Sequence, residues 1–175
     1  CSSRTRAIHS GGQTPSNSNA IEFITFASTG NGTNFGDITT LTSSHQSGSD
    51  QTRGIIAAGK VQPANNYTDT IEFITMASEG NMVDFGNLTV AKSHGACANS
   101  TTRFVHASGQ LNPSGYTNVM DYITIATTGN ATDFGDTVNS GSYGWTNGVV
   151  GSSTRSLFAL GSNDSGTYNN IEFIT

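Results

Sequence analysis

Two kinds of charged residue recur along the sequence at regular spacing. An arginine follows a threonine four times, and an acid stands second in a five-residue motif that is also present four times; these residues are Arg6, Arg53, Arg103 and Arg155, with Glu22, Glu72, Asp121 and Glu172. Such a pattern predicts either a ring of charges around a central channel or a repeated contact between neighbouring units. The contact would be an ion pair or an arginine cap on backbone carbonyls. Repeated positions in an array mostly serve the packing of its units, so the sequence favours a contact.

The other candidates for chemistry do not gather into a catalytic or metal-binding pattern. His9 and His106 stand at the repeat position that holds Ile56 and Phe158 in other copies, which indicates a packing site. The sequence contains no His, Cys and Asp grouping with zinc-ligand spacing, and no nucleophile–base pair or paired-carboxylate motif. We therefore expect a protein that is not an enzyme, with no catalytic residues, no metal and no cofactor.

Tyrosine and asparagine recur in the variable segments 13–20, 60–70, 110–119 and 162–170 and are the candidate ligand-binding residues. The candidates are Asn66, Tyr67, Tyr116, Asn118, Tyr168 and Asn169. Tyrosine beside asparagine and serine offers adaptable contacts at a small entropic cost, which suits a polar ligand such as a glycan. The alternative is that each tyrosine folds over the edge of its own unit, with its hydroxyl in water.

Composition favours strands and turns as the elements that position these residues. Nearly half of the 175 residues are Thr, Ser, Asn or Gly, and only 11% are charged. Short polar side chains compete with the helical backbone for hydrogen bonds, whereas Thr suits strands and Asn and Gly suit turns. A net charge of −5 with only seven Lys and Arg argues against a nucleic-acid partner. The apolar runs, of about five residues at most, are too short for membrane insertion as a helix.

An internal repeat of about 50 residues organises the chain. IEFIT stands at 21–25, 71–75 and 171–175, and MDYIT stands at 120–124. Each copy follows a Thr-Arg pair and a short apolar run that ends in glycine, and three copies precede a Gly-Asn turn and a Phe-Gly pair. This order predicts four strands per repeat: A before Thr-Arg, B after the arginine, C at IEFIT, and D beginning at Phe-Gly.

Four short strands in each repeat, without a helical segment, are typical of a β-propeller blade. The sequence therefore predicts an all-β fold, a partial propeller with about 3.5 four-stranded blades. We expect blade 1 at about 1–40, blade 2 at about 41–90, blade 3 at about 91–140 and part of blade 4 at about 141–175. Because a propeller closes with typically 4–8 blades, we expect the polypeptide to continue into a full propeller of roughly six to eight blades; the alternative is that other chains complete the ring.

The apolar positions of strands B and C form the predicted core. They are Ile8, Ile55, Val105 and Leu157 in strand B, with Ile24, Ile74, Ile123 and Ile174 in strand C. Cys1 and Cys97 belong to strand A of blades two apart, too distant for the Cα separation that a disulfide needs. We expect both thiols to be free.

The repeat resembles the kelch repeat, which also has about 50 residues and ends strand B in a double glycine. Gly11-Gly12 matches that double glycine, and the other copies keep only the second glycine, at Gly59, Gly109 and Gly161. The kelch tryptophan is absent from every copy, and we expect the phenylalanine of each Phe-Gly pair to take its packing role. The resemblance implies a kelch-like β-propeller.

A narrower resemblance concerns the whole unit from Thr-Arg through (Ile/Met)(Glu/Asp)(Phe/Tyr)-Ile-Thr to Gly-Asn and Phe-Gly-Asp. It is similar to tandem repeats in virion structural and tail proteins of tailed phages, notably those of marine bacteria. This resemblance implies a virion structural protein, a tail component such as a fibre or nozzle, with a role in host-surface attachment. Its partners would be other virion proteins, copies of itself, or a host surface glycan. The alternative is a secreted or cell-surface glycan-binding kelch-like module.

Overall fold

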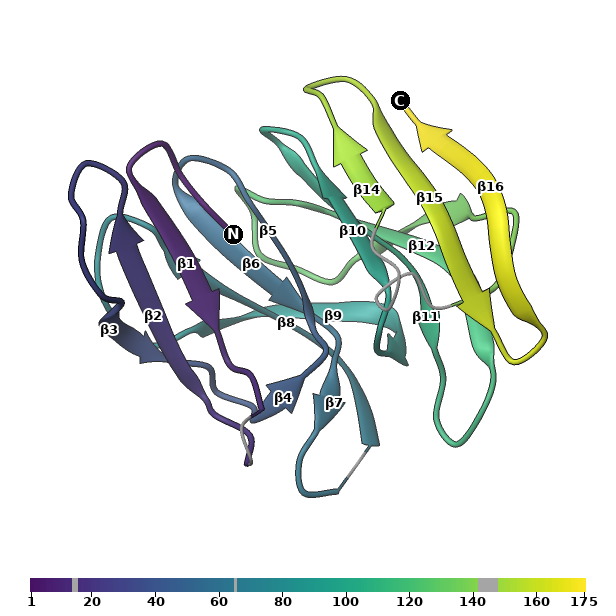
Figure 1. Ribbon diagram of the computed structural model, residues 1–175, viewed down its shortest axis with the longest axis horizontal. Helices are drawn as coiled ribbons and strands as arrows, with labels where there is room; N and C mark the ends of the chain where they lie inside the picture. Colours follow the sequence, from purple (N-terminus) through teal and green to yellow (C-terminus); the bar gives the residue numbers. More distant parts are fainter. Residues whose placement is uncertain (14–15, 65, 142–147) are drawn as a thin grey trace.

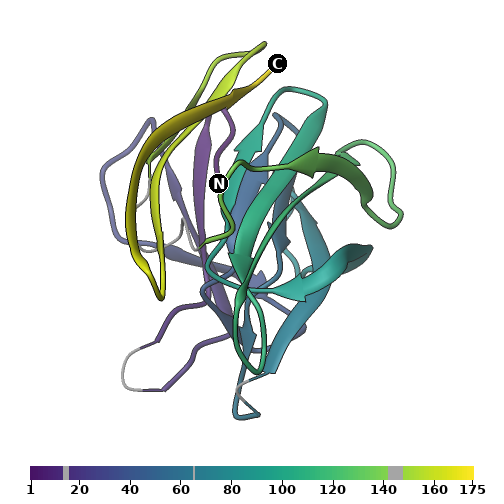
Figure 2. The same ribbon diagram turned by 90° about the vertical axis from the view of Figure 1, so that its right-hand side faces the viewer.

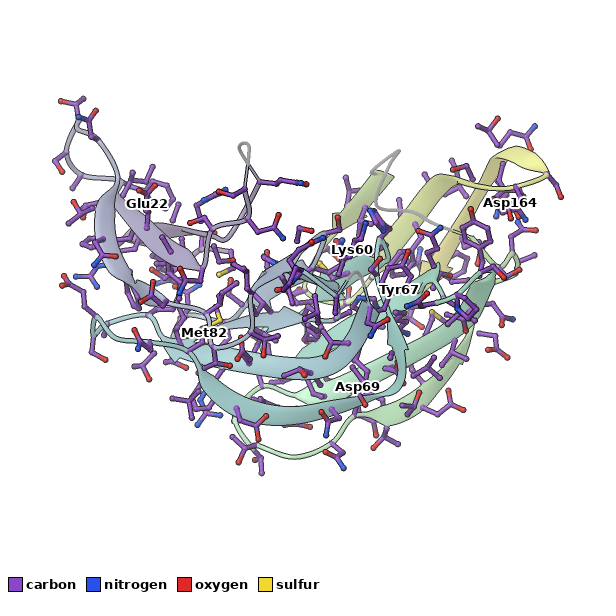
Figure 3. The ribbon with its side chains drawn as sticks, turned by 90° about the horizontal axis from the view of Figure 1, so that it is seen from below. Glu22, Lys60, Tyr67, Asp69, Met82 and Asp164 are labelled. Atoms are coloured by element: carbon purple, nitrogen blue, oxygen red, sulfur yellow. The ribbon has the colours of Figure 1, made fainter. Side chains whose placement is uncertain are left out.

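The structure, a computed structural model, describes residues 1–13, 16–64, 66–141 and 148–175. Residues 14–15 and 65 of the variable segments therefore lie outside the described residues. The described chain forms four antiparallel sheets that follow one another along the sequence, and we call them blades 1 to 4. They run from the purple strands to the yellow strands in Figure 1, and form an arc when seen from below in Figure 3.

Each blade is an up-and-down sheet in the predicted strand order. Blade 1 comprises β1 (Arg6–Ser10), β2 (Ala20–Thr25) and β3 (Thr33–Asp37), with Ser2 bridged to Ala7 in place of a full strand A. Blade 2 comprises β5 (Gln46–Ser49), β6 (Arg53–Ala57), β8 (Asn66–Thr75) and β9 (Val83–Lys92); the short strand β7 (Lys60–Val61) pairs with β8, and the short strand β4 (Thr42–Ser43) pairs with β7. Blade 3 comprises β10 (Ala96–Asn99), β11 (Arg103–Gln110), β12 (Tyr116–Thr124) and β13 (Thr132–Asp136). Blade 4 comprises β14 (Gly148–Gly151), β15 (Ser156–Asn163) and β16 (Gly166–Ile174).

Strand D begins two residues before the phenylalanine of Phe-Gly, earlier than the sequence predicts. In blade 1 the reason is that Thr33 and Asn34 already pair with Phe23 and Glu22 of β2. The A strands of neighbouring blades lie next to one another, since β10 of blade 3 contacts both β5 of blade 2 and β14 of blade 4. Figure 2 views the arc from its C-terminal end, with the yellow strands of blade 4 nearest the viewer.

The core lies between the blades, as three layers of apolar side chains. Side chains alternate along strand C, so each blade has one face toward the preceding blade and one toward the next. Ile74 of β8 and Met76, just after the end of β8, pack with Ile21 of blade 1, whereas Ile71 of β8 packs with Ile123 of blade 3. Both faces of an inner blade are therefore apolar.

Most of the predicted core positions are buried, and one is not. Ile8, Ile55, Val105, Ile74 and Ile123 are buried, and Leu157 and Ile174 are half-buried. Ile24 was expected in the core but is exposed. Its side chain lies on the face of blade 1 opposite blade 2, and no other described segment covers that face. His9, expected to be a packing residue, is exposed for the same reason.

The double-glycine position keeps its backbone conformation after its first glycine has been replaced. Gly11 has a φ of 63°, and the equivalent residues Ala58 and Ser108 have φ values of 63° and 54°. Left-handed backbone costs an L-residue about 1–2 kcal/mol, so blades 2 and 3 hold this strain where blade 1 does not. The kelch-like turn is thus a property of the repeat rather than of glycine alone.

Candidate functional site

Two arginines of the Thr-Arg pairs, Arg6 and Arg53, join their own blade to the next one. The guanidinium carbon of Arg6 lies 4.6 Å from the centre of the Phe23 ring in strand C, and Arg6 Nη1 donates to the backbone carbonyl of Met76 in blade 2 at 3.1 Å. Arg53 repeats the arrangement, donating to the carbonyl of Ile125 in blade 3 at 2.8 Å. A stacked guanidinium gains both cation–π attraction and a charge-assisted hydrogen bond. These arginines are backbone caps between blades, the structural alternative that the sequence favoured.

The acid in strand C contacts the preceding blade. Its partner there is the residue four positions after the phenylalanine of strand D. Glu172 Oε2 accepts a hydrogen bond from Val138 N at 2.8 Å, and Glu72 accepts one from the backbone of Thr39. In blade 3, Asp121 Oδ1 accepts from the hydroxyl of the equivalent Thr89 at 2.5 Å. The repeated acids thus fasten blades through hydrogen bonds of their own.

The Gly-Asn and Phe-Gly motifs meet each other across the same boundaries. The Gly80-Asn81 turn of blade 2 docks on β3 of blade 1: Gly80 N donates to the Phe35 carbonyl at 2.8 Å, and Asn81 Oδ1 accepts from Asp37 N at 3.0 Å. A Cβ on Gly36 would lie only 2.2 Å from the Gly80 carbonyl oxygen. Glycine is therefore required after the phenylalanine because the backbone of the next blade approaches so closely.

The three candidate tyrosines lie on the hairpins between strands B and C, which all point to the lower side in Figure 1. The hydroxyl of Tyr67 donates to Gln110 Oε1 in blade 3 at 2.8 Å, and that of Tyr116 donates to Asp164 Oδ1 in blade 4 at 3.0 Å. The bond to Asp164 raises the pKa of Tyr116. Figure 3, which views these hairpins end-on, places Tyr67 near the middle of the arc and Asp164 at its yellow end.

Tyr168 differs from the other two tyrosines, although its sequence context is similar. Tyr116 pairs with Gln110, whereas Tyr168 pairs with Gly161, the register position that Thr117 occupies in blade 3. Its hydroxyl consequently bonds back to the carbonyl of Ser140, at 3.0 Å, in the connection from blade 3. The tyrosine hydroxyls therefore form hydrogen bonds between blades, and the bonds of Tyr116 and Tyr168 lie at exposed positions.

The candidate asparagines do not form a single group. Asn66 is exposed, and its Oδ1 accepts a hydrogen bond from Asn112 Nδ2 of the neighbouring hairpin at 2.8 Å. Asn169 is exposed on β16. Asn118 is half-buried, and its backbone carbonyl accepts from Thr137 N at 2.8 Å. Asn66 and Asn169 are thus the exposed candidates, Tyr67 and Tyr116 are half-buried, and the binding of a ligand by these hairpins stays a prediction.

A repeated turn between strands A and B was not anticipated from the sequence. A Ser or Asp two residues before each Thr accepts hydrogen bonds from the backbone of both the Thr and the Arg; these residues are Ser3, Asp50, Ser100 and Ser152. Such side-chain turns order the chain just before the arginine. The motif (Ser/Asp)-x-Thr-Arg is visible in the sequence once the repeats are aligned.

A charged group is buried at the centre of the interface between blades 2 and 3. Lys92 Nζ lies 2.8 Å from Asp121 Oδ2, and neither side chain is exposed to solvent. His106 is also fully buried, and its pKa is lowered well below its usual value by burial and then by the charge of Lys92. Complete burial leaves no path by which a solvent-borne substrate could reach these groups, so they stabilise or specify the interface.

Two concave regions are lined by residues of the A strands and of the turns between strands A and B. A groove of about 510 Å³ over the strands A is lined by hydroxyl and amide groups such as Ser2, Ser49 and Asn99. A cavity of about 360 Å³ between blades 3 and 4 is lined by Arg103, Phe134 and Thr175, among others. The residues that follow the strand-C motifs of blades 2 and 3, Met76 and Ile125, are part of the buried core.

No three His, Cys, Asp or Glu side chains within the described ranges gather closely enough to hold a metal ion. Cys1 and Cys97 are free thiols. Burial raises the pKa of Cys97 to about 11, which makes its thiol a poor nucleophile. No helix among the described residues is long and apolar enough to cross a membrane.

Comparison with known proteins defines the fold. No protein-family model matches the sequence, and no curated protein matches it. The structure is similar to that of YjhT, a kelch-repeat β-propeller protein, with a TM-score of 0.73 and 8% sequence identity. The similarity covers 92% of this chain, whereas the chain spans 57% of the YjhT structure. The predicted all-β fold of kelch-like propeller blades is therefore confirmed.

Proposed function

We propose that this protein is a non-enzymatic β-propeller of a tailed-phage particle, a tail component that presents its tyrosine-bearing hairpins to the host surface. The observation that carries the proposal is how the repeated polar residues are used. Arg6, Arg53, Glu72 and Glu172 all bind across blade boundaries. The repeated charged side chains thus hold neighbouring blades together, which suits a structural role. The similarity of the repeat unit to phage tail repeats is the reason for proposing a location in the phage particle.

Attachment is assigned to the hairpin face because its residues are polar and aromatic, and its tyrosines are held by hydrogen bonds. Tyr67 and Tyr116 are fixed by hydrogen bonds to the next blade, so little side-chain freedom remains to be lost on binding. Tyrosine with asparagine suits the ring faces and hydroxyl groups of a sugar. A host surface glycan is accordingly the proposed ligand.

Mass spectrometry and antibody labelling of purified particles test whether the protein is part of the phage tail. The protein should purify with particles at a fixed number of copies, and gold-labelled antibodies should mark the tail. A protein found only outside the particle, in the culture medium or on the cell surface, would contradict the particle role.

Replacing Tyr67, Tyr116 and Tyr168 together by Ala tests the attachment surface. Particles that carry the variant should lose most of their attachment to host cells, while the melting temperature of the protein changes little. The matched control replaces Thr101 and Ser153, exposed residues in turns at the opposite edge of the arc. Equal loss of attachment in both variants, or unaltered attachment in the tyrosine variant, would contradict this role.

The second candidate is a secreted or cell-surface glycan-binding module. The observation that favours it is the same polar hairpin face, which does not require a particle in order to bind a sugar. A glycan array probed with the isolated protein distinguishes the two, because a secreted lectin must bind as a free domain. The tyrosine variant is again the matched control.

A further inference from the structure

The carboxylates at the second position of the strand-C motif are satisfied differently at the three blade interfaces. Lys92 Nζ lies 2.8 Å from Asp121 Oδ2, and Asn170 Nδ2 donates to Glu172 Oε1 at 2.7 Å. Glu72 is only 3% exposed, yet its Oε1 has no hydrogen-bond partner among the described residues. The interface between blades 1 and 2 therefore buries a carboxylate oxygen that no nitrogen donor of the described chain reaches.

A small cavity lies beside Glu72. Its volume of about 10 Å³ leaves room for one particle of about the size of a water molecule. The oxygen-bearing side chains among its lining residues belong to Thr40, Thr42, Thr68, Thr70 and Glu72. A threonine hydroxyl has two lone pairs, so Thr68 and Thr70, whose hydroxyls lie 2.7 Å apart, can still bind a further group. The cavity thus offers one carboxylate and several neutral oxygens to a single small occupant.

The interface between blades 2 and 3 shows which group the repeat places at this position. Thr42 stands one repeat, 50 residues, before Lys92. Besides its carboxylate partner, Lys92 Nζ binds the carbonyl oxygen of Val119 at 3.0 Å. The equivalent of Val119 in blade 2 is Thr70, which lines the cavity. An ammonium group therefore stands in one interface where the shorter side chain of Thr42 leaves a cavity in the other.

We propose that the cavity beside Glu72 binds one small monovalent cation, an ammonium or potassium ion, between blades 1 and 2. A buried carboxylate needs a balancing charge, and a water molecule would supply a hydrogen bond without one. Calcium and magnesium take several carboxylate or water ligands, whereas the cavity has one carboxylate and no room for bound waters. Thr40, Thr68 and Thr70 are half-buried and Lys92 is fully buried, so the ion can exchange with solvent. When Glu72 is replaced the ion returns to solvent, and no charge is left buried.

Thermal unfolding in three chloride salts of equal concentration tests the proposal. The salts are those of ammonium, potassium and tetramethylammonium, at about 0.2 M and about pH 8, where Glu72 is ionised. Tetramethylammonium provides the same ionic strength but is too large for the cavity. The melting temperature should be about 2–3 °C higher in ammonium or potassium chloride, because an ion that binds only the folded protein stabilises it. The larger of the two shifts identifies the preferred ion.

Three variants assign the salt effect to the cavity. Glu72→Gln removes the carboxylate and should abolish the difference between the salts. Asp84→Asn is the matched control, since Asp84 is an exposed carboxylate opposite Glu72 on β9, and it should keep the full difference. Thr42→Lys places a tethered ammonium group at the position of Lys92. It should raise the melting temperature in tetramethylammonium chloride and make the three salts equivalent.

Crystals soaked in a rubidium or thallium(I) salt locate the ion directly, because both ions replace potassium and scatter anomalously. We expect an anomalous peak beside Glu72 and none beside Asp121, whose partner is Lys92. If Thr42→Lys does not fold, Glu72→Gln and the anomalous map still decide. Equal melting temperatures in all three salts would overturn the proposal and leave the cavity to water. A salt effect that persists in Glu72→Gln, or a peak found only elsewhere on the protein, would overturn it as well.

Discussion

The interface between blades 1 and 2 and the interface between blades 2 and 3 share an apolar frame but differ at the centre. In both, an isoleucine and a phenylalanine of one blade pack against strand C of the next; the pairs are Ile21 and Phe35 with Ile74, and Ile71 and Phe85 with Ile123. Three equivalent positions then diverge. Thr42, Ile56 and Glu72 stand at the first interface, where Lys92, His106 and Asp121 stand at the second.

The difference changes how a buried carboxylate is satisfied. Asp121 faces the ammonium group of Lys92 at 2.8 Å. Glu72 has Thr42 in place of a lysine, and a small cavity of about 10 Å³ lies among Thr42, Ile56 and Glu72. Its Oε1 has no hydrogen-bond partner among the described residues, and burial raises the pKa of Glu72 to about 7. The same blade geometry therefore accommodates a carboxylate paired with a buried ammonium group and a carboxyl group that has no such partner among the described residues.

The largest effect we expect is a difference between two isosteric substitutions. Asp121→Asn should lower the free energy of unfolding by about 3–5 kcal/mol, because it leaves the Lys92 charge buried without its partner. Glu72→Gln at the same repeat position should cost less than about 1 kcal/mol at pH 7, because no buried cation depends on Glu72. Urea unfolding of both variants measures the two values. Similar costs at the two sites would show that the polar centres are equivalent after all.

Truncation of the apolar frame should affect both interfaces alike. Ile74→Ala and Ile123→Ala should each cost about 2–5 kcal/mol, because both side chains are buried at the same repeat position. Ile24→Ala, the same substitution at the exposed end of the arc, should cost less than about 1 kcal/mol for the isolated chain. Urea unfolding again provides the measurement. A cost at Ile123 several kcal/mol above that at Ile74 would mean that the charged centre also tightens its apolar surroundings.

The pH dependence of stability should report Glu72. Because its pKa is raised to about 7 in the folded state, the folded protein holds a proton that the unfolded chain releases near pH 4.5. Stability must therefore fall as pH rises from about 4.5 to about 7, by an amount on the order of 2 kcal/mol. Burial lowers the pKa values of His45, His94 and His106, which has the opposite effect below about pH 6.5.

Subtracting the profile of Glu72→Gln from that of the unaltered protein separates these contributions. The histidine contribution is common to both proteins and cancels. The difference in the free energy of unfolding should decline from about pH 4.5 to about pH 7 and be flat above about pH 8. A flat difference at every pH would show that Glu72 titrates normally and that the interface admits water.

The sequence was sufficient to predict the strands because each repeat marks its own boundaries. IEFIT, Gly-Asn and Phe-Gly recur at fixed spacing, and their hydrogen bonds lie within one blade or between two neighbours. Burial was harder to predict, because Ile24 and Ile74 stand in the same motif and differ only in whether a preceding blade covers them. No local pattern carries that information.

The candidate site was predicted less completely than the fold. The hairpins meet on one face as the repeat implies, but Tyr168 stands three residues before its strand-C isoleucine, where Tyr116 stands four before its methionine. A shift of one residue along a strand turns a side chain to the opposite face, and this sends Tyr168 toward the preceding blade. Lys92 was missed altogether, because its importance depends on Asp121 in the neighbouring blade.

The smallest effect concerns the double-glycine turn that blades 1 to 3 share. Gly11→Ala should lower the free energy of unfolding by about 1–2 kcal/mol, because a Cβ there is strained by the φ of 63° and would lie 3.0 Å from the His45 ring. The reverse change in blade 2, Ala58→Gly, relieves the same backbone but removes a buried methyl group, so we expect a net change below about 1 kcal/mol. Thermal unfolding of the two variants gives the comparison. If Gly11→Ala proves as mild as Ala58→Gly, the backbone of blade 1 must relax away from the left-handed conformation, and the turn would then differ between blades that share one repeat.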